Sequence, residues 1–395
     1  MVHKRPTISD VARVANVSIG TVSNAINSPE KVRPETMARI EAAIKELSYR
    51  PSAVARFLPA ATIVRRSTDY LRLPRLISVG YISVDYVCRV GVLPHRDDRV
   101  TAEHIEKALG GPAANVAVAA AGVGSDFALD VELATAVGED PDSDWALAEL
   151  AQRGVHALTI RRPFNNRLSR CVVIVEANGS RTIINEPFEL SEVDLTAHLA
   201  VTAEDRPCCL HIEGYHYERM LGSFGRFRDA GWKVSLHTTG LPASSKTPEA
   251  FAELVRAIDL VFVNDVTLRA IFALRVSVAT MIDNLETWLH AIGPRADVVL
   301  TLGDLGAVVF PRDDSAPIFV PALAVEVVDA TGAGDTFAGV FLAFWMHGQS
   351  LGEAARHAAV AASLTTTAEG AQGRISSLDD LRAELERMAP EEAEA

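Results

Sequence analysis

The residues with the clearest chemical role lie between positions 327 and 337, where two glycines separate two aspartates. An apolar run predicts a strand that ends at Asp329, and the apolar residues 337–345 predict a helix. The backbone N–H groups of residues 332–334 would then point out of a helix N-terminus, which is a site for anions. A carboxylate at Asp335 would repel a phosphate bound there, unless it accepts a proton from an attacking hydroxyl. This segment therefore predicts phosphoryl transfer to an alcohol.

The surrounding chain has the pattern of an α/β fold. From Leu76 onward, short Val- and Ile-rich runs alternate with Ala-rich helical stretches. This alternation predicts a doubly wound sheet with helices on both faces, formed by one domain over residues 75–387. Examples of the runs and stretches are residues 76–84, 114–121, 171–175, 260–263, 298–302 and 307–310.

Two motifs in this region resemble a known family. The run Asp-Ala-Thr-Gly-Ala-Gly-Asp at 329–335, followed by Thr-Phe, is similar to the C-terminal signature of the ribokinase-like PfkB carbohydrate kinases. The run Gly-Gly-Pro-Ala-Ala-Asn-Val-Ala at 110–117 resembles their N-terminal signature. The resemblance covers residues 75–385 and implies a ribokinase-like doubly wound sheet with a small β lid. It also implies ATP and Mg²⁺ as cofactors, a monovalent cation as a further option, and a small sugar or nucleoside phosphorylated on a hydroxymethyl group.

The same resemblance assigns roles to individual residues. One aspartate would deprotonate the acceptor hydroxyl, and neighbouring amides would hold the charge on the transferred phosphoryl group; these catalytic residues are Asp335, Gly332, Ala333 and Gly334. The end of the first strand and the Gly-Gly turn would bind the substrate through Asp85, Gly110, Gly111 and Asn115. Loops at the strand ends would bind the nucleotide through Asn264, Thr301, Gly303, Gly306 and Gly370. No residue is assigned to the metal.

Two segments depart from the family pattern where it serves the metal and the phosphates. The family commonly has Asn-x-x-Glu after a central strand, and this sequence has Thr267 in place of the glutamate. The family also has an Asp-x-Asn-x-Arg loop, where this sequence has His-Thr-Thr-Gly-Leu at 237–241. Two functions therefore stay open: an active kinase, or a kinase fold that serves only as the ligand sensor of a transcription factor. The intact motif at 332–335 favours the kinase.

The charge of the chain is divided unevenly. Residues 1–66 carry 11 Lys or Arg and 5 Asp or Glu, a net of +6, whereas residues 67–395 carry 27 against 46, a net of −19. The two parts add up to the −13 of the whole chain. This asymmetry indicates a nucleic-acid-binding segment attached to an acidic body.

The basic segment has the outline of a helix-turn-helix domain. Apolar residues recur at helical spacing, among them Val11, Val14, Ala15, Val22 and Ile40. The runs Thr-Ile-Ser-Asp-Val-Ala at 7–12, Val-Ser-Ile-Gly-Thr-Val-Ser at 17–23 and Glu-Leu-Ser-Tyr-Arg-Pro at 46–51 closely resemble the DNA-binding headpiece of the LacI repressor family. A three-helix bundle that contacts proteins is the alternative, but the charge asymmetry favours DNA.

The resemblance to LacI implies how this segment would meet DNA. In that family the second helix enters the major groove and a hinge helix, here residues 52–58, inserts a leucine into the minor groove. The implied DNA-binding residues are Ser18, Ile19, Gly20, Thr21, Ser23, Asn24 and Leu58. One headpiece reads one half-site, so double-stranded operator DNA would be bound by a homodimer. We expect a headpiece at 1–58, a linker at 59–74 and an acidic tail at 388–395.

A lid and its neighbourhood can also be located. Alternating residues at 169–184 flank an Asn-Gly turn, which predicts a β-hairpin. In the PfkB family this region covers the sugar and often forms the dimer interface, so here it would pair two bodies. His211, His216 and the turn at Glu213 and Gly214 lie near a strand end. Lining of the cleft is one alternative for them, but we expect surface histidines without partners.

Composition excludes several other classes of protein. No apolar run is long enough for a membrane-spanning helix, and the N-terminus lacks the pattern of a secretory signal, so we expect a cytoplasmic protein that does not bind membranes. The cysteines do not have the spacing of a disulfide framework or a zinc site. We expect mostly buried, reduced thiols at Cys88, Cys171, Cys208 and Cys209.

Overall fold

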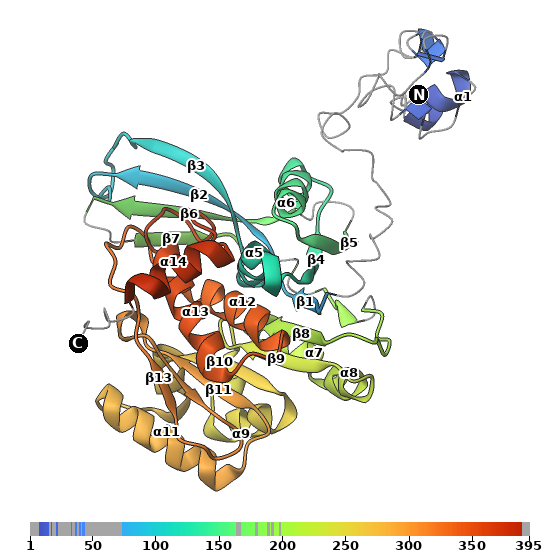
Figure 1. The fold of residues 1–395 in the computed structure, drawn as a ribbon. Coiled ribbons are helices and arrows are strands. Elements are labelled where there is room, and N and C mark those ends of the chain that lie inside the picture. The colour runs from blue at the N-terminus through green and yellow to red at the C-terminus, as the bar shows by residue number, and fades with distance from the viewer. Residues whose placement is uncertain are drawn as a thin grey trace, which may run out of the picture. The chain divides into compact units, whose positions relative to one another are not determined.

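The computed structural model describes residues 8–15, 17, 21–22, 33, 36–37, 39–40, 42–43, 73–162, 167–177, 181–187, 190, 193–196 and 199–388. The chain divides into two compact units, residues 1–71 and residues 72–395. Each unit is described by itself below, and Figure 1 gives the labels of the elements.

The larger unit is built on a nine-stranded sheet with the order β13-β12-β11-β10-β9-β8-β1-β4-β5. The strands from β11 to β5 are parallel, and β12 and β13 continue the sheet as antiparallel strands. The predicted doubly wound α/β fold is therefore confirmed. The strands are β1 (Arg75–Val79), β4 (Asp130–Val137), β5 (His156–Arg161), β8 (Cys208–Glu213), β9 (Lys233–His237), β10 (Leu260–Asn264), β11 (Asp297–Thr301), β12 (Ala307–Phe310) and β13 (Ile318–Val320).

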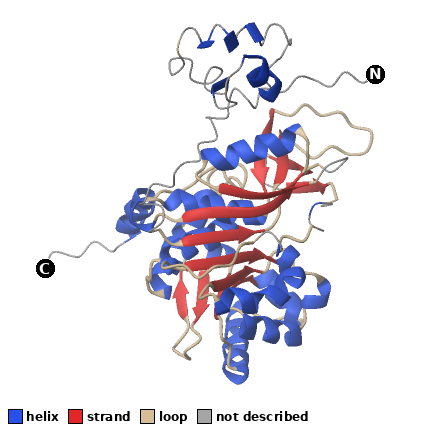
Figure 2. Cartoon of the chain, turned by 90° about the vertical axis from the view of Figure 1, so that its right-hand side faces the viewer, coloured by secondary structure: helices blue, strands red, loops and turns tan. Residues whose placement is uncertain are grey.

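Helices cover both faces of this sheet, as Figure 2 shows. Helix α5 packs on the central strands β1, β4 and β8, and α12 packs on both α5 and α13. The helices are α5 (Pro112–Val123), α6 (Pro141–Gln152), α7 (Tyr217–Met220), α8 (Phe224–Asp229), α9 (Pro248–Ala257), α10 (Asp265–Phe272), α11 (Val278–Ile292), α12 (Ala333–Met346), α13 (Leu351–Thr365) and α14 (Leu378–Met388). Short 3₁₀ turns lie at Ser125–Phe127, Gly214–His216, Leu221–Ser223, Ala243–Ser245 and Gly303–Leu305.

Side-chain caps fix where several helices begin. The carboxylate of Asp140 accepts hydrogen bonds from the backbone N–H groups of Asp142 and Ser143 at the start of α6. Thr247, Ser277 and Ser350 cap α9, α11 and α13 in the same way. A side-chain oxygen at this position satisfies a helix N–H group that has no partner inside the helix.

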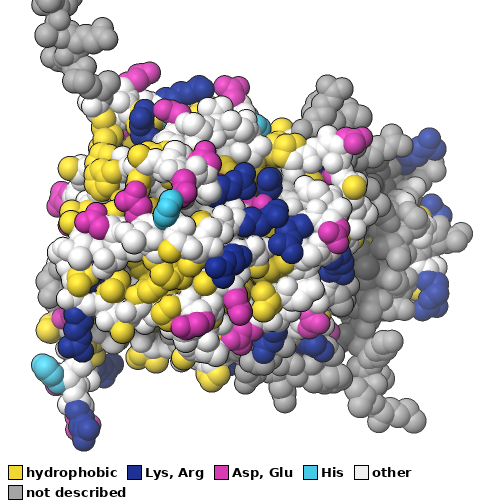
Figure 3. Space-filling model, turned by 90° about the horizontal axis from the view of Figure 1, so that it is seen from below, with side chains coloured by type: hydrophobic (Ala, Val, Ile, Leu, Met, Phe, Trp, Pro, Cys, Tyr) yellow, Lys and Arg dark blue, Asp and Glu magenta, His cyan; other side chains and the backbone are white. Residues whose placement is uncertain are grey.

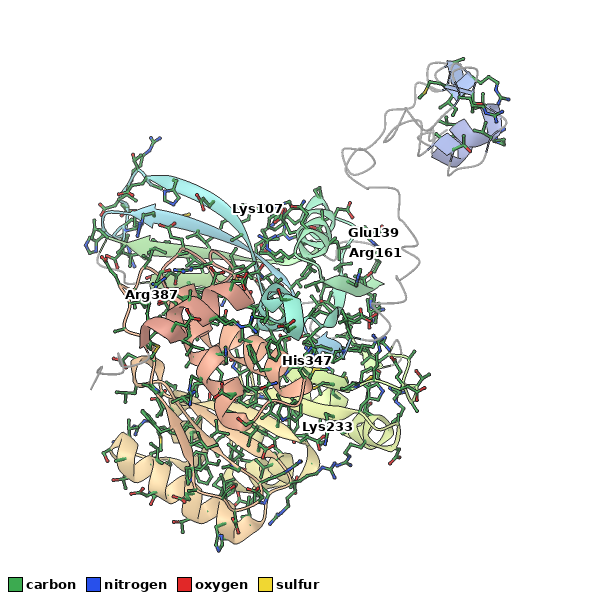
Figure 4. The ribbon with its side chains drawn as sticks, viewed as in Figure 1. Lys107, Glu139, Arg161, Lys233, His347 and Arg387 are labelled. Carbon is green, nitrogen blue, oxygen red and sulfur yellow. The ribbon has the colours of Figure 1, made fainter. Side chains whose placement is uncertain are left out.

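Four further strands form a separate small sheet, the lid, in the order β3-β2-β6-β7. Its strands are β2 (Ser83–Val90), β3 (His104–Gly110), β6 (Ser169–Glu176) and β7 (Arg181–Asn185). The antiparallel pairing of β6 with β7 confirms the predicted hairpin. Lys107 of β3 extends toward α6 (Figure 4), where its Nζ lies 2.7 Å from a carboxylate oxygen of Asp142, and Arg170 of β6 pairs with the same carboxylate. Asp142 thus ties the root of the lid to the main body.

The prediction of one continuous strand over residues 76–84 is wrong. The structure divides it at Gly80 into β1 of the main sheet and β2 of the lid. A Cβ atom at Gly80 would lie 2.3 Å from the carboxylate carbon of Glu213, so no other residue fits where the chain leaves the sheet. As a result Asp85 does not end the first strand but lies within β2.

The expected strand before Asp329 is absent from the described segment 321–332. The backbone N–H groups of Val328 and Asp329 both donate to the carbonyl oxygen of Thr366, at 2.8 and 3.0 Å. Val327 is 60% exposed. The apolar run therefore binds the end of α13 rather than a neighbouring strand.

The smaller unit is described at α1 (Ile8–Ala15) and at scattered residues beyond it. A small apolar core is present, with buried side chains at Val11, Ala15, Val22, Ile40 and Ala43, whereas Val14 is exposed. Of the expected DNA-binding residues, Thr21 is described and is half-buried. Ser18, Ile19, Gly20, Ser23, Asn24 and Leu58 lie outside the described residues, as do residues 389–395 of the expected tail.

Two compositional expectations concern the whole chain. The cysteines are free, with Cys171, Cys208 and Cys209 buried and Cys88 partly exposed. Within the described ranges, none of the helices combines the length and the apolar character needed to cross a membrane.

The contact between α5 and α12 leads to a stability prediction. A Cβ atom at Gly339 of α12 would lie 2.4 Å from the carbonyl oxygen of Val116 and 2.9 Å from the Cβ of Ala119. Because a packed core resists added volume, we expect Gly339→Ala to lower the free energy of unfolding by about 1–3 kcal/mol. Tryptophan fluorescence during urea unfolding measures this change, since all four tryptophans lie in the larger unit.

Gly225→Ala in α8 is the matched control. Nothing lies within 4 Å of a Cβ atom at Gly225, so the added methyl group meets open space. Alanine in a helix is favoured over glycine by roughly 0.5–1 kcal/mol, so this variant should be at least as stable as the wild type. An equal decrease in the free energy of unfolding in both variants would contradict the close packing at Gly339.

Candidate active site

The carboxyl ends of the parallel strands place several polar residues along one edge of the main sheet. Glu213, His237, Asn264 and Thr301 are the last residues of β8, β9, β10 and β11. Neighbours in this row are paired in register, Glu213 with His237 and Asn264 with Thr301. In open α/β sheets this edge is where ligands bind. The sequence-predicted residues Asn264 and Thr301 are thus brought together.

Asp335 lies in the first turn of α12 and is 8% exposed. The helix is capped by Gly332, whose φ of 75° and contact with Ala371 leave no room for a side chain. Amides in the first turn have no carbonyl partner within the helix, so the Ala333 and Gly334 N–H groups are directed out of its N-terminus. Asp335 thus lies beside the helix N-terminus that the sequence predicts as an anion site, and binding of an anion there stays a prediction.

Both oxygens of the Asp335 carboxylate have a neighbour. Asn115 Nδ2 of α5 donates to Oδ2 at 2.8 Å, and His237 Nδ1 lies 3.2 Å from Oδ1. Asn115 is held in turn, because Gln372 Nε2 donates to its Oδ1 at 2.9 Å. This row of contacts fixes the side-chain amide of Asn115, so its N–H faces the aspartate.

Asp329 holds the loops on either side of α12 and α13. Its Oδ1 accepts hydrogen bonds from the N–H and the hydroxyl of Thr331, at 2.9 and 2.6 Å. Its Oδ2 accepts from the N–H of Gly370 at 2.9 Å. Gly370, predicted to contact the nucleotide, is therefore fixed to the loop that precedes the anion site.

The expected substrate residues cluster around the junction of the lid and α5. A Cβ atom at Gly110 would lie 2.3 Å from a carboxylate oxygen of Asp85, and Gly111 caps α5. Ser83 Oγ donates to Asp85 Oδ1 at 2.9 Å. Burial raises the pKa of the Asp85 carboxyl, and hydrogen bonds from Ser83 and Cys171 partly offset this effect. The predicted residues Asp85 and Gly110 are thus in contact, whereas Asn115 contacts Asp335.

Two of the expected nucleotide residues form the turn between β11 and β12. Gly303 lies in a 3₁₀ turn, and the carbonyl of Gly306 accepts a hydrogen bond from Leu302 at 2.8 Å. A Cβ atom at Gly306 would lie 2.1 Å from the carbonyl oxygen of Val320, so the turn closes against β13. Asn264 accepts a hydrogen bond at its Oδ1 from the N–H of Thr267, 2.7 Å away, and so caps α10.

A fully buried carboxylate at Glu213 organises the Gly-Gly turn, and the sequence analysis missed this role. Its oxygens accept hydrogen bonds from the backbone N–H of Tyr81 at 2.9 Å and of Ala113 at 3.2 Å. His216 Nδ1 contacts the same carboxylate at 2.9 Å. Burial raises the pKa of Glu213, and these hydrogen bonds act against the increase. No motif in the sequence links Glu213 to Tyr81 and Ala113, which lie 132 and 100 positions away.

The expectation of exposed, unpartnered histidines at His211 and His216 is wrong. His216 is 2% exposed and binds Glu213, and His211 is completely buried. His211 Nδ1 lies 2.9 Å from Ser235 Oγ, and burial, with a smaller effect of His237, lowers the pKa of His211 to about 3. The reason is that His211 lies in β8, a central strand of a sheet whose two faces are covered by helices, and His216 lies in the turn directly after it.

The free edge of the lid is fastened to the loop that follows α13. Glu369 contacts Arg89 Nη1 of β2 and His104 Nε2 of β3, each at 2.9 Å. The hydrogen bond to Glu369 raises the pKa of His104. We call this group of three residues the latch. Gly370, the next residue, donates its N–H to Asp329, so the loop that carries Glu369 is bound to the loop that precedes α12.

The comparisons with known proteins can now be placed beside this geometry. The profile of the pfkB family carbohydrate kinase matches residues 73–378. This chain belongs to that family. The profile of the bacterial regulatory proteins, lacI family, matches residues 7–52, so the chain joins a LacI-type domain to a PfkB kinase domain.

Individual relatives agree with this division. The ribokinase of Arabidopsis thaliana is 26% identical over 347 residues, covering 84% of this chain and 85% of the relative. The ATP-dependent ribose-1-phosphate kinase of Halopiger xanaduensis is 26% identical over 306 residues, covering 75% and 94%. Catabolite control protein A of Staphylococcus xylosus is 44% identical over 75 residues, which is 19% of this chain and 22% of that protein. The solved structure of a putative ribokinase from Agrobacterium tumefaciens shares the fold, with a TM-score of 0.68 at 22% identity over 80% of this chain and 98% of the other.

The latch leads to a prediction about the motion of the lid. Because β2 and β3 each lose a charged partner, and partly exposed ion pairs are weak, Glu369→Gln should increase amide hydrogen exchange in these strands by up to about tenfold. Hydrogen-exchange mass spectrometry measures the change. Glu103→Gln, at an exposed position next to β3, should leave exchange in the lid unchanged.

The latch should also depend on pH. Because the pKa of His104 is raised in the folded protein, its pairing with Glu369 is complete below the ordinary pKa and is lost as the pH rises through the raised value. The protection of β3, taken relative to the intrinsic rate of exchange at each pH, should therefore fall over that range in the wild type but not in the Glu369→Gln variant. An equal response of both proteins would contradict the assignment of the latch.

Proposed function

We propose that this chain transfers the terminal phosphoryl group of ATP to a hydroxymethyl group of a small sugar or nucleoside, and that its N-terminal unit binds operator DNA. The observation that carries the first part is the Asp335 carboxylate. It is nearly buried, contacted at both oxygens, and placed in the first turn of a helix whose N-terminus favours an anion.

The chain's own residues have the following roles in the proposed reaction. Asp85 and the Gly-Gly turn bind the acceptor between the lid and α5. Asp335 removes the proton of the acceptor hydroxyl. The hydroxyl oxygen then bonds to the γ-phosphorus of ATP, while the bond from that phosphorus to the bridging oxygen breaks and ADP leaves. The amides of Ala333 and Gly334 hold the charge on the transferred group, and alignment supplies much of the rate. The closed lid excludes water, which would otherwise accept the phosphoryl group.

The residues present fit the phosphates of ATP better than they fit a tightly held metal ion. ATP supplies the phosphoryl group, and Mg²⁺ bound to it would neutralise phosphate charge. The helix N-terminus and the cradle at Gly332 favour an anion of this kind. Asn264 uses its Oδ1 to cap α10, and Thr267 has a hydroxyl where relatives carry a carboxylate. We therefore assign no residue as a ligand of Mg²⁺ or of a monovalent cation.

As substrate we propose a pentose or a compound that contains one, and the names of two relatives support this choice. These relatives are named for ribose and for ribose 1-phosphate. A buried carboxylate such as Asp85 suits a ligand rich in hydroxyl groups, because each hydroxyl can donate a hydrogen bond to it. Pentoses and nucleosides are thus the first acceptors to test.

The proposed role in transcription depends on a homodimer. The lid exposes large apolar side chains at Ile105, Ile183 and Ile184, which favours pairing of two lids. Two such bodies would bring two LacI-type domains to one palindromic site. Figure 3 shows basic and acidic side chains interspersed on one face of the body, so this face is not uniformly repulsive to DNA. A sugar that favours the closed lid would change DNA affinity if the two arrangements bind DNA differently.

A second function is favoured by the two segments that depart from the family pattern, at Thr267 and at residues 237–241. A weakened metal and phosphate network would reduce turnover while leaving sugar binding intact. The kinase fold would then act only as the ligand sensor of a transcription factor.

Asp335→Asn separates the two functions. Because an amide cannot accept the proton of the acceptor hydroxyl, we expect the variant to lose at least about 100-fold in kcat. The measurement is ADP formation with ATP, Mg²⁺ and a panel of pentoses and nucleosides. A wild type that forms no more ADP than the variant with every acceptor would support the sensor and reject the kinase.

DNA binding has its own test in the full-length chain. Lys and Arg contacts to phosphates release counterions, so log affinity should fall linearly with log salt, with a slope of about −0.9 for each phosphate contacted. Fluorescence anisotropy on a palindromic operator-like duplex measures the slope. A duplex of unrelated sequence is the control, and affinity independent of salt would reject the proposal.

A further inference from the structure

His237 is the residue of the site whose role is least explained by the family resemblance. It is the last residue of β9, paired in register with Glu213 of β8 and Phe262 of β10. Only 6% of its surface is exposed. The backbone of His237 holds its place in the sheet, so the imidazole is not needed to pair the strands.

The imidazole ring lies between the base and the anion site. Its Nδ1 is 3.2 Å from Asp335 Oδ1, and its Nε2 is 3.3 Å from Thr239 Oγ1. A Cβ atom built on Gly334 would lie 3.7 Å from Nε2, so the far edge of the ring borders the first turn of α12. Nδ1 is buried and has no hydrogen bond of good geometry within the described residues. A buried polar nitrogen in this state needs a partner, and the Asp335 carboxylate is the acceptor facing it.

The charged groups around the ring decide which nitrogen carries the proton. On β8, His211 is neutral because its pKa is lowered to about 3, and Glu213 is occupied by Tyr81, Ala113 and His216. On α12, Asp335 is the carboxylate in contact with the ring. A carboxylate accepts hydrogen bonds, so Nδ1 bears the proton and Nε2 can accept from the Thr239 hydroxyl.

We propose that His237 is a positioning residue for Asp335: its Nδ1–H holds Oδ1 while the Asn115 amide holds Oδ2. Two donors on opposite oxygens fix the plane of the carboxylate and aim it at the incoming hydroxyl. This inference rests on the proposed function, because Asp335 acts there as the base. The ring edge beside Gly334 also forms one wall of the anion site.

Two amide variants test the position of the donor. The amide nitrogen of asparagine lies near the place of Nδ1, whereas that of glutamine reaches toward Nε2. His237→Asn should therefore keep kcat within about tenfold of the wild-type value. In His237→Gln and His237→Ala, kcat should fall about 100-fold. In all three variants the KM for the acceptor should change by less than about threefold. Equal losses in the Asn and Gln variants would indicate a merely structural role and overturn the proposal, as would a wild-type kcat in His237→Ala.

A second measurement is independent of turnover. NMR of the histidine ring nitrogens should show the His237 proton on Nδ1 in the wild type, and Asp335→Ala should remove this preference. Asp329→Asn is the control, since Asp329 binds Thr331 and Gly370 rather than the ring, and the preference should persist. If the wild type forms no ADP, the proposed kinase function fails by itself. A His237 tautomer that does not respond to Asp335→Ala overturns the positioning contact in either case.

Discussion

The structure depends on keeping one carboxylate nearly out of water at the positive end of a helix. Such a group is costly to bury unless donors satisfy its oxygens, and an isolated buried carboxylate would take up a proton instead. Asn115 and His237 approach the two oxygens of Asp335, and the dipole of α12 favours negative charge nearby. The donors that offset the cost of burying the carboxylate also orient it. The stability of the fold and the reactivity of Asp335 therefore depend on the same contacts.

A second buried carboxylate, on the strand next to His237, is stabilised by hydrogen-bond donors in the same way. Glu213 is fully buried, and its oxygens accept two backbone N–H groups and an imidazole N–H. It joins the end of β1, the start of α5 and the turn after β8. Together with Asp329, which joins the loops at Thr331 and Gly370, it forms a framework of buried acceptors. Loops that would otherwise have free amides are fixed by carboxylates from distant parts of the chain.

The sequence was informative where chemistry is local. The Gly-rich run before Asp335 and the Gly-Gly run before Asn115 are contiguous motifs, so the α/β fold and these residues could be predicted from them. Contacts between distant residues could not: Glu369 reaches His104 across 265 positions, and no periodicity encodes such a pair. Val327 and Val328 were expected in a strand because they are apolar, yet backbone bonding to Thr366 decided their conformation. His211 was expected at the surface because a strand end usually lies there, whereas its strand has neighbours on both sides.

The close crossing of α5 and α12 has a consequence for how the protein can respond to a ligand. These helices carry Asn115 and Asp335, and Gly339 lets their backbones touch with no spare volume. Packed interiors transmit displacement rather than absorb it. We therefore expect the pair to move as one stiff block, so that a displacement caused by a ligand is taken up by the lid and the 366–376 loop rather than at this crossing.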